Sequence, residues 1–304
     1  MNPVVTFASW LLASAPGGSG RSAIRMDTDK IQEARNLIDT WLADRGPSGT
    51  IWNYSRSNFS SRLKELVSSY KLNQGCLDCC AFTSLLFACL RCYPVETVRW
   101  AMNVFDNGSG DLGGFQTTTN DILRNKRLSD LLNDNPTDSG QPKYPDFTDW
   151  ILQTTIIASF RSREGIIYNG MRSENNNIGM KFNAFVEETD ELFNLCTTFF
   201  LPPMISKYDG ERFNTNDKLE QGNAIILILP AKFINPSSNS THVVFLDSKF
   251  TYYQDDYNGN HNVDWIGCRM HNYGNRELLQ IVKNTVPANN SNGLNRIVCL
   301  KMKL

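Results

Sequence analysis

An uncharged run from residue 81 to residue 90 constrains the fold of this chain more than any other segment. Its sequence, Ala-Phe-Thr-Ser-Leu-Leu-Phe-Ala-Cys-Leu, has the composition of a buried helix, so the rest of the fold has to cover it. Two cysteines, Cys79 and Cys80, come directly before the run and fall in the first turn of this helix. The unpaired backbone N–H groups and the positive end of the helix dipole favour a thiolate at that place.

A second segment far downstream supplies a partner for such a thiolate. Residues 241–246 form a strand-like run that carries His242, one of only three histidines in the chain. A further short run follows and ends at Asp255 and Asp256. A cysteine at a helix start, a histidine on a strand and a carboxylate after the next strand form a nucleophile, a base and an orienting group. This order of residues predicts a cysteine hydrolase.

Composition excludes several other classes of protein. The 304 residues suffice to bury a large core, and 41% hydrophobic with 20% charged residues is ordinary for a soluble globular protein. Thirty basic residues oppose thirty-one acidic ones, without a polybasic run, so we expect no nucleic-acid partner. No stretch approaches the roughly 18 apolar residues of a membrane span. The oligomeric state stays open.

The eight cysteines are too sparse for a disulfide scaffold, and five of them fall between residues 76 and 92. Spacing within the pairs Cys76–Cys79 and Cys89–Cys92 suits zinc. The helix expected between the pairs would hold them roughly 15 Å apart, whereas zinc–sulfur bonds measure about 2.3 Å. We therefore expect no metal and no cofactor, and interpret most of the cysteines as small buried hydrophobic residues.

The periodicity of apolar residues predicts a helical first half and a strand-rich second half. Helices are expected at residues 28–43, 60–70, 81–92, 95–104 and 147–160, with loops at 107–114 and 133–145. Strands are expected at residues 165–169, 192–201, 224–229, 243–246, 251–253 and 296–300, with His261 and His271 in loops. This segregation predicts an α+β fold in which a helical layer carries the nucleophile and an antiparallel sheet carries the histidine and aspartate.

The expected domain organisation is simple. Residues 1–25 are rich in Gly, Ser and Pro and are expected to form a flexible leader. Residues 26–304 are expected to form a single catalytic domain, with a helical half at about 26–160 and a sheet half at about 161–304. The leader lacks the basic start of a classical signal peptide, which favours a cytoplasmic protein or an exported effector over classical secretion.

The stretch around the two cysteines is similar to a known pattern. Asn73-Gln74-Gly75 followed by Cys-x-x-Cys-x-Ala-Phe-Thr resembles the papain-type pattern Asn-Gln-Gly-x-Cys-Gly-x-Cys-Trp-Ala-Phe-Ser. The resemblance implies that Gln74 contributes to an oxyanion hole. Alignment on Ala-Phe makes Cys79 the nucleophile, whereas alignment on Gln74 selects Cys80. The chain departs from the pattern because Gln74 is one residue closer to Cys79 and because Cys80 replaces the tryptophan.

Two further resemblances favour Cys79. Residues 78–82 are similar to the Asp-Cys-Ser-Gly start of NlpC-type cell-wall peptidases. In transglutaminase-like enzymes an arginine follows the nucleophile by twelve residues, which Arg91 matches for Cys79.

The histidine segment also resembles papain-fold enzymes. Residues 219–225, Leu-Glu-Gln-Gly-Asn-Ala-Ile, look like the strand that precedes the His-Val strand in NlpC- and CHAP-type enzymes. Residues 255–259, Asp-Asp-Tyr-Asn-Gly, are similar to the Asp-Pro-Asn-x-Gly ending of YopT- and AvrPphB-like effector peptidases. That resemblance implies that Asp256 orients His242, with Asp255 as the alternative.

Together these resemblances imply a papain-like cysteine peptidase that hydrolyses an amide bond of a protein or peptide substrate. Cys79, His242 and Asp256 would form the triad, Gln74 would support the oxyanion, and a thioester would be the intermediate. A deamidase, transglutaminase or cell-wall amidase could use the same triad. A binding protein that keeps the fold without the chemistry is the alternative from a different class.

Overall fold

The computed structural model describes the helical half almost completely and the strands of the second half. The described residues are 27–49, 51–69, 72–75, 77, 79–133, 144–171, 195–200, 224–230, 241–246, 251–254, 263–272, 275–282 and 296–302. The expected leader at residues 1–25, most of the loop at 133–145, His261, Asp255 and Asp256 lie outside them.

Five long helices form where the apolar periodicity predicted them. They are α2 (Thr28–Arg45), α3 (Arg56–Ser68), α4 (Cys80–Cys92), α5 (Pro94–Asn107) and α8 (Phe147–Arg163), with short helices α6 (Asp121–Arg124) and α7 (Leu128–Asn133) between α5 and α8. The second helix starts four residues earlier than predicted. Its start is set by Ser55, whose hydroxyl accepts a hydrogen bond of 3.1 Å from the backbone N–H of Asn58.

The second half of the described chain forms a seven-stranded antiparallel sheet. Its strands are β3 (Leu195–Phe200), β4 (Ala224–Pro230), β5 (Thr241–Leu246), β6 (Thr251–Gln254), β7 (Val263–Asn272), β8 (Asn275–Val282) and β9 (Arg296–Met302). The order is β3-β9-β4-β5-β7-β6, and β8 pairs with β7 as well. The structure thus confirms the predicted α+β class and the segregation of helices from strands.

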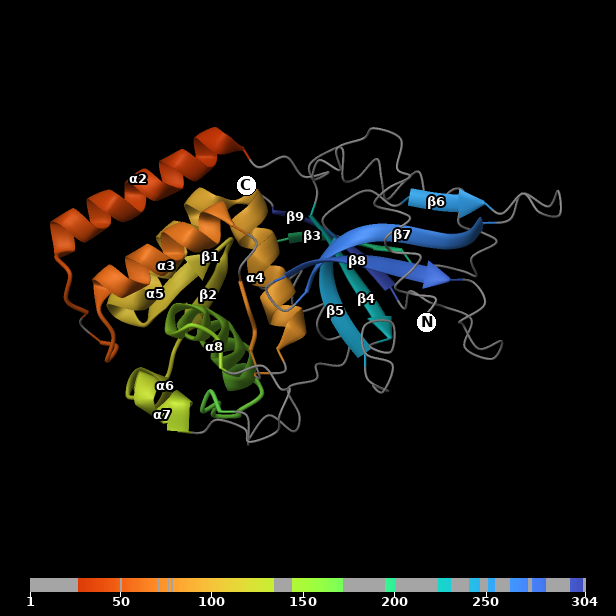
Figure 1. Ribbon diagram of the computed structural model, residues 1–304. Helices are drawn as coiled ribbons and strands as arrows, with labels where there is room; N and C mark the ends of the chain where they lie inside the picture. The colour runs from red at the N-terminus through yellow and green to blue at the C-terminus, as the bar shows by residue number, and fades with distance from the viewer. Residues whose placement is uncertain are drawn as a thin grey trace.

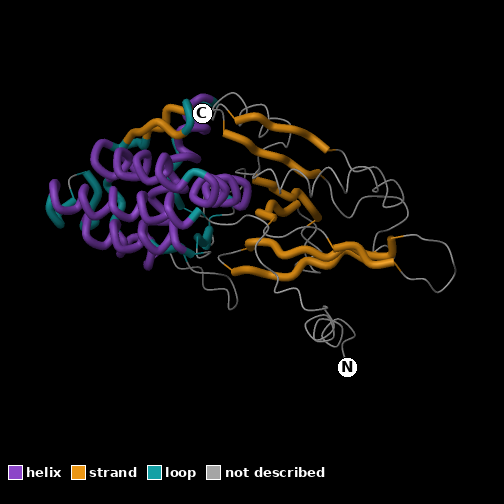
Figure 2. The backbone as a smooth tube through the Cα atoms, turned by 90° about the horizontal axis from the view of Figure 1, so that it is seen from above, coloured by secondary structure: helices purple, strands orange, loops and turns teal. Residues whose placement is uncertain are grey.

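Helix α4 lies where the two halves meet. Figures 1 and 2 show the helices gathered on one side and the large sheet on the other, and Figure 1 shows α4 nearest the sheet. Toward the helices, the rings of Phe82 and Phe160 lie 5.0 Å apart. Toward the sheet, Phe87 and Phe245 lie 4.9 Å apart. Every residue from 82 to 91 is buried, which confirms the central buried helix predicted from composition.

Three local predictions were wrong, and four strands were missed. Residues 107–114, expected to be a loop, contain β1 (Ser109–Leu112), which forms a hairpin with β2 (Phe115–Thr118). Both residues of the connecting turn, Gly113 and Gly114, have positive φ, the backbone that a tight hairpin turn requires. Strands β7 and β8 were not predicted either. His271, which was expected in a loop, lies in β7.

Residues 165–169, expected to be a strand, have no regular structure. The backbone there is held by a side chain, because Asn120 donates from Nδ2 to the carbonyl of Tyr168 over 2.9 Å. Ile166 and Ile167 project outward and are 48% and 71% exposed. Among the described helices, none is long and apolar enough to cross a membrane.

Gly170 fixes how the chain leaves α8, and this gives a stability prediction. Its φ is +76°, and an added Cβ would lie 2.5 Å from Trp150 and 2.7 Å from Leu123. Gly170→Ala therefore adds overpacking, typically ~1–3 kcal/mol, to the strain of left-handed backbone. Gly165→Ala is the matched control, because Gly165 has φ +72° but open space around its Cα.

We expect urea denaturation to show a clearly larger loss of unfolding free energy for Gly170→Ala than for Gly165→Ala. Equal losses would mean that Trp150 and Leu123 can move aside at no cost.

Candidate active site

The site is built around the start of α4. Cys79 is the residue before the helix, and its carbonyl accepts the first helical bond from the backbone N–H of Thr83 over 2.9 Å. Its side chain makes no capping bond to the first turn. The N–H groups of that turn therefore lack a capping side chain from Cys79 and retain the positive end of the helix dipole.

A tight turn before the cysteines fixes Gln74. The side-chain oxygen of Asn73 accepts from the backbone N–H of Gly75 over 2.9 Å, and Gly75 has φ +56°. The N–H of Leu77 then bonds to the carbonyl of Gln74 over 3.2 Å. Gln74 is buried, which is unusual for a polar residue of its kind. Its position is set by the turn, as an oxyanion-hole residue requires.

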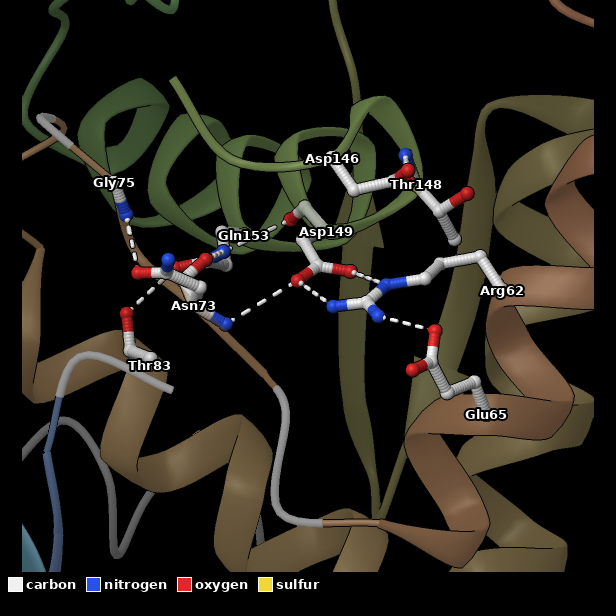
Figure 3. Close-up of polar contacts among 9 residues, drawn as sticks. All are labelled: Arg62, Glu65, Asn73, Gly75, Thr83, Asp146, Thr148, Asp149 and Gln153. Atoms are coloured by element: carbon white, nitrogen blue, oxygen red, sulfur yellow. Dashed lines mark hydrogen bonds and ion pairs between the residues drawn. The ribbon is translucent and has the colours of Figure 1, made fainter. Parts of the chain in front are cut away.

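Helix α8 holds this turn through two side chains one helical turn apart. Asp149 accepts from the backbone N–H of Asn73 over 3.2 Å, and Gln153 donates from Nε2 to the carbonyl of Asn73 over 2.8 Å. Both main-chain groups of Asn73 are thus bonded to α8, as Figure 3 shows. We call this pair of contacts, Asp149 and Gln153 on Asn73, the α8 clamp.

An arginine on α3 balances the charge of the clamp. Arg62 donates from Nε and Nη2 to the two carboxylate oxygens of Asp149 over 2.9 and 2.8 Å, and from Nη1 to Glu65 over 2.5 Å. Asp149 is fully buried, and this burial raises its pKa to about 6, although Arg62 and the N–H of Asn73 act in the opposite direction. At neutral pH the carboxylate and the guanidinium are therefore both charged.

The two adjacent cysteines point to different surroundings. Sγ of Cys79 lies 3.2 Å from Oε1 of Gln153 and 3.4 Å from Oγ1 of Thr83, so this thiol faces α8 and is 1% exposed. Cys80 is partly exposed. Helical spacing puts Cys80 on the same face as Ser84 and Phe87, and that face is turned toward the sheet.

His242 lies on the strand that packs against this face of α4. Ser84 donates from its hydroxyl to the carbonyl of Val243 over 3.1 Å, and Phe87 packs on Phe245. The residue numbers rise together along the two elements, from Ser84 to Phe87 on α4 and from Val243 to Phe245 on β5. The two elements therefore run in the same direction at this contact. Cys80 precedes Ser84 by roughly 6 Å of helix, and His242 precedes Val243 by roughly 3.3 Å of strand. The helix start and His242 are therefore at a similar level.

The face of β5 on which the imidazole of His242 lies follows from the alternation of side chains along a strand. Val243 and Phe245 share the face of β5 toward α4, and His242 and Val244 share the other face. Strand β7 pairs with β5 only at Phe245 and Leu246, so within the described chain the start of β5 has β4 alone as a neighbour. The start of α4 and the ring of His242 are therefore at a similar level but on opposite faces of β5. His242 is buried, with 6% of its surface exposed.

Sequence reasoning missed the residues that hold the site together. Arg62, Asp149 and Gln153 were not among the predicted site residues. The available signal was the presence of an acid and an amide four residues apart in the otherwise uncharged helix expected at residues 147–160. Arg91, used to favour Cys79, lies at the opposite end of α4 and is buried there.

The described residues contain no group of three or more His, Cys, Asp or Glu side chains that could hold a metal ion. Comparisons with known proteins give no family for this chain. No family model matches its sequence, and no curated protein matches it.

The raised pKa of Asp149 predicts a specific pH dependence of stability. Between its ordinary value of 3.8 and the folded value of about 6, the folded protein binds a proton that the unfolded chain has released. The stability contributed by this carboxyl is therefore fully present below about pH 4 and is lost as the pH rises to about 6. Relative to an Asp149→Asn variant, the wild type should lose unfolding free energy across this window and show no further change above it.

Urea unfolding of both proteins at several pH values between 4 and 7.5, roughly spanning this window, measures the difference. Other carboxylates cancel in the comparison. A difference that grows in favour of the wild type as the pH rises would show that Arg62 outweighs burial.

Proposed function

We propose that this protein is a cysteine peptidase with a papain-like arrangement, in which a thiolate at the start of α4 attacks an amide carbonyl of a protein or peptide substrate. The observation that carries the proposal is the contact between α4 and β5, where Ser84 bonds to Val243 and Phe87 packs on Phe245. This contact sets the cysteine helix and the histidine strand at a common level. Under this proposal, a nucleophile and a base from distant parts of the sequence serve one site.

The chemistry proceeds by two acyl transfers. The cysteine sulfur bonds to the carbonyl carbon, and the carbonyl electrons move onto the oxygen. Backbone N–H groups at the start of α4 and the amide of Gln74 stabilise that oxyanion, each such donor typically contributing ~2.7–4 kcal/mol. The imidazolium of His242 protonates the leaving amine as the C–N bond breaks, which leaves a thioester. Water then adds as His242 accepts its proton, and the thiol leaves.

The fixed turn before α4 supports this assignment. The turn that carries Gln74 is fixed on both sides, by the bonds within residues 73–77 and by the α8 clamp. Preorganised donors of this kind act without reorganisation during the reaction. Asp256, or Asp255, would orient the ring of His242, as the sequence resemblance implies.

Single substitutions test the proposal. We expect His242→Ala and one of the two variants Cys79→Ala and Cys80→Ala to lower peptide hydrolysis by at least about 10³-fold, because a triad loses its function when any member is removed. Cys92→Ala is the matched control for loss of a half-buried thiol at the other end of α4 and should leave hydrolysis unchanged. The measurement is cleavage of a peptide library followed by mass spectrometry.

Three results would redirect or reject the assignment. Ammonia release from glutamine side chains without chain cleavage would make the protein a deamidase, and formation of new isopeptide bonds would make it a transglutaminase. Hydrolysis that survives both cysteine substitutions would reject a thiol mechanism. A folded protein without thiol-dependent turnover on peptides, proteins or cell-wall fragments would reject the enzyme proposal in favour of a binding role.

A further inference from the structure

We infer that Gln153 is a positioning residue that holds Cys79 as a neutral thiol, so that Cys80 supplies the thiolate of the site. The inference starts from the polar contacts around Gln153, which has no exposed surface. Only the use of the thiolate as a nucleophile rests on the proposed function. The division of roles between the two thiols is argued from the hydrogen bonds around Cys79 and from the position and exposure of Cys80.

The orientation of the Gln153 amide is fixed by its neighbours. Its Nε2 lies 2.8 Å from the carbonyl of Asn73 and 3.1 Å from the carbonyl of Asp149. Both neighbours are acceptors only, so the atom between them has to be the NH₂ group. The other end of the amide, Oε1, is therefore an acceptor and faces Cys79 and Thr83.

An acceptor at this place determines the state of the Cys79 thiol. Sγ lies 3.2 Å from Oε1 of Gln153, and only a protonated sulfur can donate to that oxygen. The hydroxyl of Thr83 lies 2.5 Å from the same oxygen, 3.1 Å from the carbonyl of Cys79 and 3.4 Å from Sγ, and its one proton is best placed for the short contact with Gln153. A thiolate at Cys79 would face the lone pairs of Gln153 in a fully buried place, which disfavours the charged form.

Cys80 differs from Cys79 in its burial and in its place on the helix. It is the first residue of α4, where the helix dipole favours negative charge, and it is partly exposed. Its face of the helix carries Ser84, which contacts the histidine strand at Val243. It also follows Gln74 by six residues, the separation that the papain-type pattern has between glutamine and nucleophile.

The charged and titratable groups around the two thiols are few among the described elements. On α8, Asp149 is next to Gln153 and is bonded to Arg62 of α3. On β5, His242 is at the level of Cys80.

Thiolate absorbance at 240 nm tests the inference without requiring turnover or reagent access. The difference between wild type and Cys80→Ala, recorded across pH, gives the ionisation of Cys80, and the difference from Cys79→Ala gives that of Cys79. We expect Cys80 to ionise at least about one pH unit below Cys79. Ionisation of Cys79 at the same pH as Cys80, or at a lower one, would overturn the inference.

Two substitutions at Gln153 separate positioning from general packing. Gln153→Met keeps the length and removes the acceptor, so Cys79 should ionise at least about one unit lower than in the wild type. Gln153→Glu keeps an acceptor and adds negative charge, so Cys79 should stay neutral. A purely structural role would loosen the site equally in both variants. Equal ionisation of Cys79 in the two variants would overturn the role of Gln153.

Thr83→Val tests the same inference if a Gln153 variant does not fold. It removes the competing hydroxyl and leaves the bond between Cys79 and Gln153 in place, so Cys79 should remain neutral. Lower ionisation of Cys79 in Thr83→Val would show that Thr83, not Gln153, holds the thiol. A correct order of ionisation in a protein without hydrolytic activity would support this inference and count against the proposed function only.

Discussion

The attachment of Asn73 to α8 is the constraint on which the geometry of the site depends. Both main-chain groups of Asn73 are bonded to buried side chains, Asp149 and Gln153, which are one helical turn apart. A buried polar group left without its partner costs roughly 1–3 kcal/mol. Any shift of the turn that carries Gln74 would break both bonds together, so α8 sets the position of residues that belong to another part of the sequence.

The charge within this attachment explains why α3 belongs to the site as well. A fully buried carboxylate is expensive unless it is paired and hydrogen-bonded. Arg62 supplies two of the bonds to Asp149 and the backbone of Asn73 supplies a third. The same ion pair therefore ties α3, α8 and the turn before α4 into one unit. That unit presents the start of α4 to the sheet, where Ser84 bonds to Val243.

The helices and strands of the fold could be predicted from the sequence better than the side-chain contacts that build the site. The buried helix at residues 81–90 was predictable because an uncharged run of that length has to be covered, and β4 and β5 were predictable from their β-branched residues. The hairpin of β1 and β2, at residues 109–118, was missed because its strands are short and rich in polar residues. The ion pair joins Arg62 to Asp149 across 87 positions. Neither residue shows by itself that it is buried, because burial is a property of the packed helices.

The choice between two adjacent cysteines illustrates the same limit. Consecutive residues on a helix point about 100° apart, so neighbours in sequence enter different environments. Alignment on the Ala-Phe pair matches positions within the buried helix. It selects Cys79, which faces α8 and Gln153. Alignment on Gln74 compares the distance from the oxyanion donor to the nucleophile, and it selects Cys80. In the proposed mechanism the reaction depends on that second distance, so the spacing from Gln74 is the criterion that agrees with the proposed role of Cys80.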